Sequence, residues 1–150
     1  FEDVAVGAGP GAPGGHVRMW DGRTGDELQS FFAFDQGFLG GVFLGVGDVT
    51  ADGTKDLIVG AGPGAAAHVK VFAGGPGTGL PGTGAGIGSP GGAGALGTEV
   101  RSFIAGDPAL RGGAYVAGGD FSGDGASDIV VGTGRFNPEF IDVYDGNTLE

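Results

Sequence analysis

Short apolar runs bounded by glycine dominate the pattern of hydrophobic and polar positions along this chain. The clearest runs are Val4–Val6, Leu57–Val59, Val69–Phe72 and Ile129–Val131. Runs of this length that are rich in β-branched residues predict β-strands. The segment His16–Trp20 also alternates between apolar and other side chains, as a strand in a sheet with two unequal faces requires. No segment shows a helical period, so the sequence predicts an all-β protein.

The strand pattern repeats along the chain. Asp56–Gly60 recurs 72 residues later as Asp128–Gly132, and it appears 53 residues earlier as Asp3–Gly7. Further matches keep the same order: His16–Trp20 with His68–Phe72 and more loosely with Phe140–Tyr144, Ser30-Phe31 with Ser102-Phe103, and the Gly-Gly pair at 40–41 with the pair at 112–113. Self-similarity at this period is the sequence signature of a repeat architecture.

One repeat carries an insertion rich in glycine and proline, at residues 74–98. The two repeat spacings differ by 19 residues, and the N-terminal repeat has only the short turn Asp21–Asp26 at the matching place. Such a segment cannot bury enough apolar surface to offset its chain entropy. We therefore expect a repeat of about 53 residues, with a flexible surface loop at 74–98 that can be trimmed without loss of the fold.

Each repeat predicts four short antiparallel strands, which is typical of a β-propeller blade. The predicted strands are Gly41–Asp48 and Ala114–Asp120 (first), Asp56–Gly60 and Asp128–Gly132 (second), His16–Trp20 and His68–Phe72 (third), and Glu27–Phe34 and Glu99–Ile104 (fourth). We expect about two and a half blades, incomplete at both ends. They are a partial blade over 1–40, a blade over 41–112 that contains the insertion, and a partial blade over 113–150.

The number of predicted blades is too small for a closed ring. A closed propeller has roughly 4–8 blades, more than 150 residues can supply. Two interpretations stay open. The chain is either an excerpt of a longer protein, or a protomer whose open blade edges are completed by neighbours in a homo-oligomer or fibre.

Two loops between the first and second predicted strands concentrate oxygen-bearing side chains. Each spans nine residues, with Asp at positions 1, 5 and 9, a hydroxyl at position 3 and Gly at position 6. Calcium is a hard cation that takes six to eight oxygen ligands, and glycine permits the sharp turn that such a loop needs. The candidate ligands are Asp48, Thr50, Asp52, Asp56 and the Thr54 carbonyl in one loop, and Asp120, Ser122, Asp124, Asp128 and the Ala126 carbonyl in the other.

The alternative is a pair of Asp-Gly hairpin turns whose acids are merely solvated. Three carboxylates within nine residues repel one another, and neither loop has a balancing basic cluster. We therefore expect Ca²⁺ as the bound ion. Magnesium fits less well, because it prefers fewer protein ligands in strict octahedral geometry. Asp3 matches position 9 of these loops and is a candidate last ligand of a third site.

The loop and the strand after it form the pattern Gly-Asp-x-x-x-Asp-Gly-x-x-Asp-(Leu/Ile)-(Ile/Val)-Val-Gly. This pattern resembles the FG-GAP or VCBS-type repeat of integrin α-chain propellers and of related bacterial surface proteins. The bacterial variety is the more similar, through Gly-Ala-Gly-Pro-Gly followed by His-Val-(Arg/Lys)-x-(Trp/Phe), Ser-Phe and Gly-Gly-Val. The resemblance covers nearly the whole chain outside 73–98, and it implies a propeller that holds calcium through the loop residues named above. Position 3 departs from the family, where Asn or Asp is frequent, and its hydroxyl is a weaker ligand.

Composition narrows the range of partners. The chain has 18 acidic and 7 basic residues, for a net charge of −11, and it has no cysteine. A polyanionic surface repels phosphate groups, so we expect no nucleic-acid partner and no binding to anionic membranes. No stretch approaches the ~20 apolar residues of a membrane span, so we expect no membrane insertion. Without cysteine there is neither a disulfide framework nor thiolate chemistry.

Other motifs carry little weight. A G-x-G-x-x-G match at residues 9–14 is followed by proline and a predicted strand, whereas a dinucleotide site needs a helix there. His16 and His68 occupy equivalent positions at a strand start, which favours a structural hydrogen-bonding role over catalysis or metal binding. No Walker, Gly-x-Ser-x-Gly or His-Glu-x-x-His motif is present. We therefore expect that the chain is not an enzyme in its own right.

The leading hypothesis is a calcium-stabilised structural or adhesion module of an extracellular or cell-surface bacterial protein. We expect a protein or glycan ligand, with its specificity residing in loops and surfaces rather than in the fold. A self-assembling protomer of a surface fibre or sheath is one alternative. An accessory propeller region of a secreted carbohydrate- or lipid-active enzyme is another.

Overall fold

β-strands make up the regular structure of this protein. The computed structural model describes residues 3–74, 99–134 and 140–150. The strands within these ranges are β1 (Val4–Gly7), β2 (His16–Trp20), β3 (Glu27–Phe32), β4 (Val42–Gly47), β5 (Asp56–Ala61), β6 (His68–Phe72), β7 (Glu99–Ile104), β8 (Ala114–Gly119), β9 (Asp128–Thr133) and β10 (Ile141–Tyr144). A 3₁₀ turn, η1 (Pro13–Gly15), precedes β2, and the described residues contain no α-helix. The prediction of an all-β protein is confirmed.

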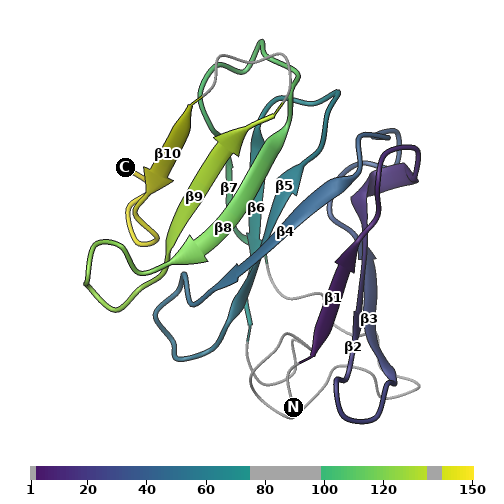
Figure 1. Ribbon diagram of the computed structural model, residues 1–150, viewed down its shortest axis with the longest axis horizontal. Helices are drawn as coiled ribbons and strands as arrows, with labels where there is room; N and C mark the ends of the chain where they lie inside the picture. The colour runs from purple at the N-terminus through teal and green to yellow at the C-terminus, as the bar shows by residue number, and fades with distance from the viewer. Residues whose placement is uncertain (1–2, 75–98, 135–139) are drawn as a thin grey trace.

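The strands form three antiparallel sheets, which Figure 1 shows side by side. The N-terminal sheet has the order β1-β2-β3, the middle sheet β4-β5-β6-β7, and the C-terminal sheet β10-β9-β8. Each sheet is therefore a meander of strands that are consecutive in the chain. Within the described part of the chain, none of the three sheets closes on itself.

The predicted strands agree with the observed ones to within one or two residues at their ends. The largest difference is in β3, which ends at Phe32 rather than Phe34. There the backbone N–H groups of Ala33 and Phe34 donate to the carbonyls of Gly15 and Gly14 in the turn before β2. The hairpins β2–β3 and β6–β7 share a register shift before their last pair, Trp20 with Glu27 and Phe72 with Glu99. Most of the predicted insertion, residues 75–98, lies outside the described residues.

One hydrophobic core fills the space between the N-terminal and middle sheets. Leu57 and Val59 of β5 contribute to it from the middle sheet, and Val17 and Met19 of β2 contribute from the N-terminal sheet. All four side chains are fully buried. Alternate residues of a strand point to opposite faces of its sheet. Leu57 and Val59 therefore define one face of the middle sheet, and Ile58 belongs to the other.

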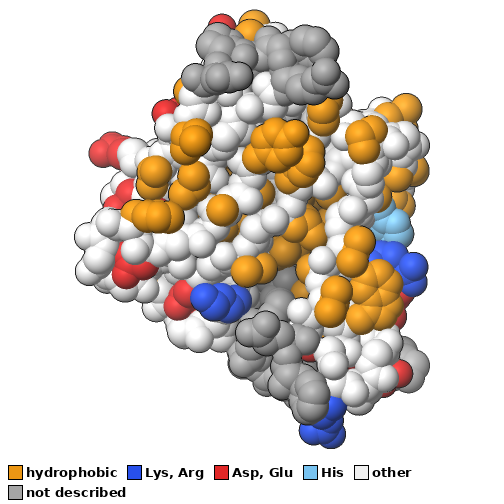
Figure 2. Space-filling view, in the orientation of Figure 1, with side chains coloured by type: hydrophobic (Ala, Val, Ile, Leu, Met, Phe, Trp, Pro, Cys, Tyr) orange, Lys and Arg blue, Asp and Glu red, His pale blue; other side chains and the backbone are white. Residues whose placement is uncertain are grey.

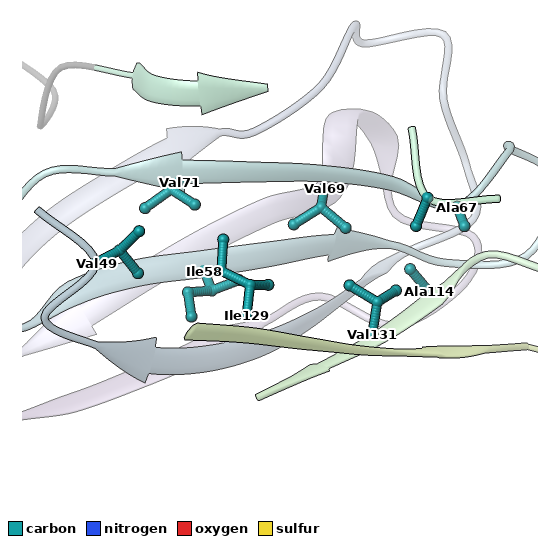
Figure 3. Packing of buried hydrophobic residues seen from close by; sticks show 9 residues of the cluster. Val49, Ile58, Ala67, Val69, Val71, Ala114, Ile129 and Val131 are labelled. Atoms are coloured by element: carbon teal, nitrogen blue, oxygen red, sulfur yellow. The ribbon is translucent and has the colours of Figure 1, made fainter. Parts of the chain in front are cut away.

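A second core fills the space between the middle and C-terminal sheets. Ile58, Val69 and Val71 of the middle sheet pack there against Ile129 and Val131 of β9, as Figure 3 shows. The middle sheet is therefore covered on both faces, and every residue of β5 is buried. This explains why β5 reads as a continuous apolar run instead of an alternating strand.

Candidate functional site

The two acidic loops occupy equivalent places in neighbouring sheets. Residues 48–55 connect β4 to β5, and residues 120–127 connect β8 to β9. The glycine at position 6 has a positive φ in both loops, 85° at Gly53 and 93° at Gly125. Position 4 is also left-handed, with φ of 55° at Ala51 and 78° at Gly123. Glycine adopts this conformation at little cost, so the predicted role of position 6 in the turn is confirmed.

The first carboxylate of each loop binds backbone N–H groups within its own loop. Asp48 accepts hydrogen bonds from the N–H of Asp52 at 3.0 Å and of Gly53 at 2.9 Å. Asp120 accepts from the N–H of Gly123 at 2.7 Å and of Gly125 at 3.1 Å. These bonds draw the middle of the loop back toward its start, which stabilises the tight curl.

The ninth residue of each loop is a buried aspartate that binds backbone N–H groups from two segments. Asp56 Oδ2 accepts from the N–H of Val49 and Thr50, and its Oδ1 accepts from the N–H of Gly74 at 2.7 Å. Asp128 repeats the arrangement with Phe121, Ser122 and Gly146. The ninth aspartate therefore ties its loop to the turn that follows the next strand of the same sheet.

The hydrogen bonds at Asp128 also set its ionisation. Burial alone raises the pKa of this carboxyl group. The backbone N–H groups of Ser122, Phe121 and Gly146 outweigh burial and hold the pKa of Asp128 below its usual value. Asp128 is therefore ionised at neutral pH although it is buried, which is the state that a cation ligand requires.

The fifth residue of each loop is exposed and has a local partner. The hydroxyl and the backbone N–H of Thr54 both donate to Asp52, and these bonds hold the pKa of Asp52 below its usual value. Asp124 accepts from the backbone N–H of Ala126 at 2.9 Å and from the side-chain amide of Asn147 at 2.9 Å. Asn147 was not among the sequence candidates. The sequence feature that could have identified it is the repeated Asp-Gly-x-Thr turn at residues 21–24 and 145–148.

The donor set of the first loop fits a hard cation. The hydroxyl oxygen of Thr50 is buried and forms no hydrogen bond of normal geometry, although the hydroxyl lies close enough to Asp52 to help lower the pKa of Asp52. A cation at the loop would give this buried oxygen a closer partner. A carboxylate has about four lone-pair positions, so the N–H bonds leave capacity on Asp48, Asp52 and Asp56. The described residues do not, however, bring three acidic or histidine side chains together around one point.

Asp3, the candidate for a third site, lies at the start of β1 and accepts a hydrogen bond from the N–H of Gly22 at 3.1 Å. Gly22, Gly74 and Gly146 thus donate to equivalent aspartates in the three sheets. These glycines were not predicted from the sequence. The feature that could have identified them is an aromatic-x-Gly motif at the end of the third strand of each repeat: Trp20-Asp21-Gly22, Phe72-Ala73-Gly74 and Tyr144-Asp145-Gly146.

The two histidines form hydrogen bonds between strands, as predicted. His16 Nε2 lies 2.7 Å from Ser30 Oγ, and His68 Nε2 lies 2.9 Å from Ser102 Oγ. Both pairs join the third strand of a repeat to the fourth. The repeated serine is therefore the partner of the repeated histidine, which gives both residues a structural role.

These features define an all-β protein with three antiparallel sheets, two of which carry acidic loops of the same residue pattern. No family model, curated protein or solved structure gave a significant match to the chain. In the part of the chain that the structure describes, no helix has the length and apolar character needed to cross a membrane.

Proposed function

We propose that this chain is a calcium-stabilised structural or adhesion module of an extracellular or cell-surface protein, built from FG-GAP or VCBS-type repeats. In this proposal each acidic loop binds one calcium ion, and the chain itself carries no catalytic role. The ion's contribution is charge: it offsets the repulsion among three carboxylates and fixes the loop between two strands.

The observation that carries the proposal is the repetition of one loop architecture in two sheets. The bonds made by Asp56 in the middle sheet are made by Asp128 in the C-terminal sheet, with donors at the same loop positions. A lone acidic turn has many explanations, but two loops with the same oxygen donors and the same backbone frame indicate one shared ligand. The buried Thr50 hydroxyl, which forms no hydrogen bond of normal geometry and lies near Asp52, supports an oxygen-seeking ion as that ligand.

In the first loop the ion would be held by the side chains of Asp48, Thr50, Asp52 and Asp56, with the carbonyl of Thr54. In the second loop Asp120, Ser122, Asp124 and Asp128 would hold it, with the carbonyl of Ala126. Binding would draw the three carboxylates of a loop together. Asp3, with its bond to Gly22, matches only the ninth position of these loops, so it would be the last ligand of a third site and would not hold an ion by itself.

We further propose that the three sheets are blades of a β-propeller. Each sheet is an antiparallel meander, and successive sheets pack face to face through hydrophobic cores. The first strands of the middle and C-terminal sheets, β4 and β8, pack against each other, and β1 packs against β4 (Figure 1). Propellers arrange four-stranded sheets in this way around a central axis.

Thermal unfolding in calcium, in magnesium and in chelator tests the proposal. A ligand that binds only the folded state stabilises it by mass action. We expect ~2 mM calcium to raise the unfolding midpoint by roughly 5–10 °C over chelator, and magnesium to raise it much less. Circular dichroism at a wavelength sensitive to β-structure would follow the transition.

The matched control is Asp107→Ala. Asp107 also binds a backbone N–H, that of Ala109, but it lies in neither acidic loop. The Asp107→Ala variant should keep the whole calcium effect, and a variant that combines Asp52→Ala with Asp124→Ala should lose it. An equal calcium effect in the two variants would show that the ion binds elsewhere and would contradict the proposal.

A further inference from the structure

The two contacts between sheets are copies of each other. Leu57 and Val59 of β5 face the N-terminal sheet, and their repeat equivalents Ile129 and Val131 of β9 face the middle sheet. Each sheet therefore has two kinds of face. The leading face packs against the sheet that comes before it in the chain, and in the middle sheet it contains Leu57 and Val59. The trailing face packs against the sheet that comes after it, and in the middle sheet it contains Ile58, Val69 and Val71.

Backbone details repeat as well. The N–H of Gly11 donates to the Leu39 carbonyl at 2.8 Å, and the equivalent Gly64 donates to the Arg111 carbonyl at 2.8 Å. A Cβ on Gly60 would lie 2.3 Å from the carbonyl oxygen of Ala114 in the next sheet. A Cβ on the equivalent Gly7 would lie 2.7 Å from Val42, also in the next sheet. The trailing face is thus built to receive a neighbouring sheet at close range.

The C-terminal sheet has an uncovered trailing face. Ile141 is 75% exposed and Val143 is 50% exposed, whereas the equivalent Val69 and Val71 are fully buried in the middle sheet. Gly132 is equivalent to Gly60, yet among the described residues a Cβ there would meet only Tyr115, at 4.0 Å. This face therefore has the apolar side chains and the glycine that form the contact in the middle sheet, but no sheet among the described residues packs against it.

The N-terminal sheet has an uncovered leading face. Val4 and Val6 are 52% and 50% exposed, whereas the equivalent Leu57 and Val59 are fully buried. Figure 2 shows apolar side chains gathered over β8–β10 and again over β1. Contiguous exposed apolar surface marks an interaction site more often than chance. The molecule therefore presents one trailing face and one leading face, the two halves of the contact that it already forms twice.

We propose that a second copy of this chain covers these faces, with the trailing face of one C-terminal sheet packed on the leading face of another N-terminal sheet. The contact is head to tail, since the two surfaces differ. Its chemistry is that of the internal contacts: Ile141 and Val143 of one copy take the places of Val69 and Val71, and Val4 and Val6 of the other take those of Leu57 and Val59. The proposal goes beyond calcium binding and does not depend on it.

A pair of complementary variants tests the proposal by analytical ultracentrifugation over a concentration series. Ile141→Lys places a charge on the trailing face, and Val6→Lys places one on the leading face. Burying an unpaired charge is costly. The dissociation constant of self-association should therefore be about tenfold higher, or more, in each variant alone than in the unmodified chain. Both positions are exposed within the molecule, so folding is retained, and circular dichroism checks this.

An equal mixture of the two variants gives the decisive result. Each variant keeps the face that the other has lost, so the mixture should form pairs with the affinity of the unmodified chain, and these pairs cannot extend. Val46→Lys is the matched control. Val46 is 46% exposed and pairs with Leu57, so it belongs to the leading face of the middle sheet and lies outside the two uncovered faces of the terminal sheets. This variant should associate like the unmodified chain.

Two outcomes would overturn the proposal. An unmodified chain that stays monomeric up to high concentration would show that something other than a second copy covers the faces. A chain that associates, but whose two variants do not restore association when mixed, would show that its contact is not head to tail between these faces.

Discussion

The aspartates at the end of the acidic loops are the residues on which the local structure depends most. Asp56 is fully buried and accepts hydrogen bonds from three backbone N–H groups, two in its loop and one at Gly74. Hydrogen bonds to a charged acceptor contribute more than neutral ones, and a buried group left without its partner is destabilising. This aspartate therefore has a structural role that exists before any ion binds.

Asp56→Asn tests that role. In asparagine an NH₂ group replaces one of the two carboxylate oxygens. At least one backbone N–H group that now donates to Asp56 would then face another donor and lose its acceptor. We expect the free energy of unfolding to fall by about 2 kcal/mol, measured by urea denaturation in chelator so that calcium does not contribute. Asp107→Asn, at an exposed turn, is the control and should change stability little. Equal losses in the two variants would contradict the structural role of Asp56.

His68 gives the protein a pH dependence. Burial lowers the pKa of His68 below 6.5, the nearby Lys70 lowers it further, and Glu99 opposes the shift. A depressed pKa means that the unfolded state binds the proton more readily. The stability that comes from neutral His68 is therefore complete above about pH 6.5 and is lost as pH falls through the lower pKa of the folded state.

We expect the free energy of unfolding to be lower at about pH 5 than at about pH 7, and His68→Gln to reduce this difference. Glutamine has no charge to gain in this range and retains a polar group near Ser102. Urea denaturation at the two pH values measures the effect. The same pH dependence in variant and unmodified protein would assign it to other groups.

Among the elements, the contact between sheets depends on glycines that allow close approach. Gly60→Ala would force a Cβ against the Ala114 carbonyl, at 2.3 Å, whereas Gly132→Ala meets only Tyr115 among the described residues. The two glycines are repeat equivalents in β5 and β9, so their strand environments match. We expect Gly60→Ala to destabilise by about 1–3 kcal/mol and Gly132→Ala to be nearly neutral. Thermal unfolding of the monomer would show the difference.

The hairpin β6–β7 offers a second test among the elements. It has the register of β2–β3, although 26 residues separate Phe72 from Glu99 and six separate Trp20 from Glu27. Replacing 73–98 with the sequence of 21–26 keeps a glycine at the position of Gly74. Because loop closure costs less for a shorter loop, we expect stability to be unchanged or higher by about 1 kcal/mol. A fall of more than several degrees in the unfolding midpoint would show that the segment contributes packing.

The strands and their order could be predicted because the same pattern of apolar runs bounded by glycine recurs along the chain. Such a pattern involves only residues that are close together in the sequence. The bond from Gly74 to Asp56 could not be predicted, since it joins residues 18 apart across a strand. The packing of the three sheets was predicted only as far as the resemblance implied a propeller. The alternation within β2 predicts that its sheet has two different faces. It does not show which face is buried, because burial depends on contacts with a neighbouring sheet.

For the whole molecule, charge is the dominant feature. The chain carries a net charge of −11, and six of its acids lie in the two loops, so calcium would reduce their mutual repulsion. Extracellular calcium modules bind with dissociation constants of about 10⁻⁴–10⁻³ M. At ~2 mM calcium a site with a dissociation constant of ~0.1 mM gains about 1.8 kcal/mol. Two such sites contribute roughly 3–4 kcal/mol, a large part of the stability of an ordinary domain.

Calorimetric titration of the chelator-treated protein with calcium tests directly whether the acidic loops bind the ion, because it counts the bound ions. We expect binding at both acidic loops, and the loss of one of these sites in Asp124→Ala while the loop from Asp48 to Asp56 still binds. The two loops lie in different sheets, so the affinity of the remaining site should be nearly unchanged. An unmodified chain that binds no calcium at millimolar concentration, or an Asp124→Ala variant with unchanged stoichiometry, would show that the acidic loops are not calcium sites.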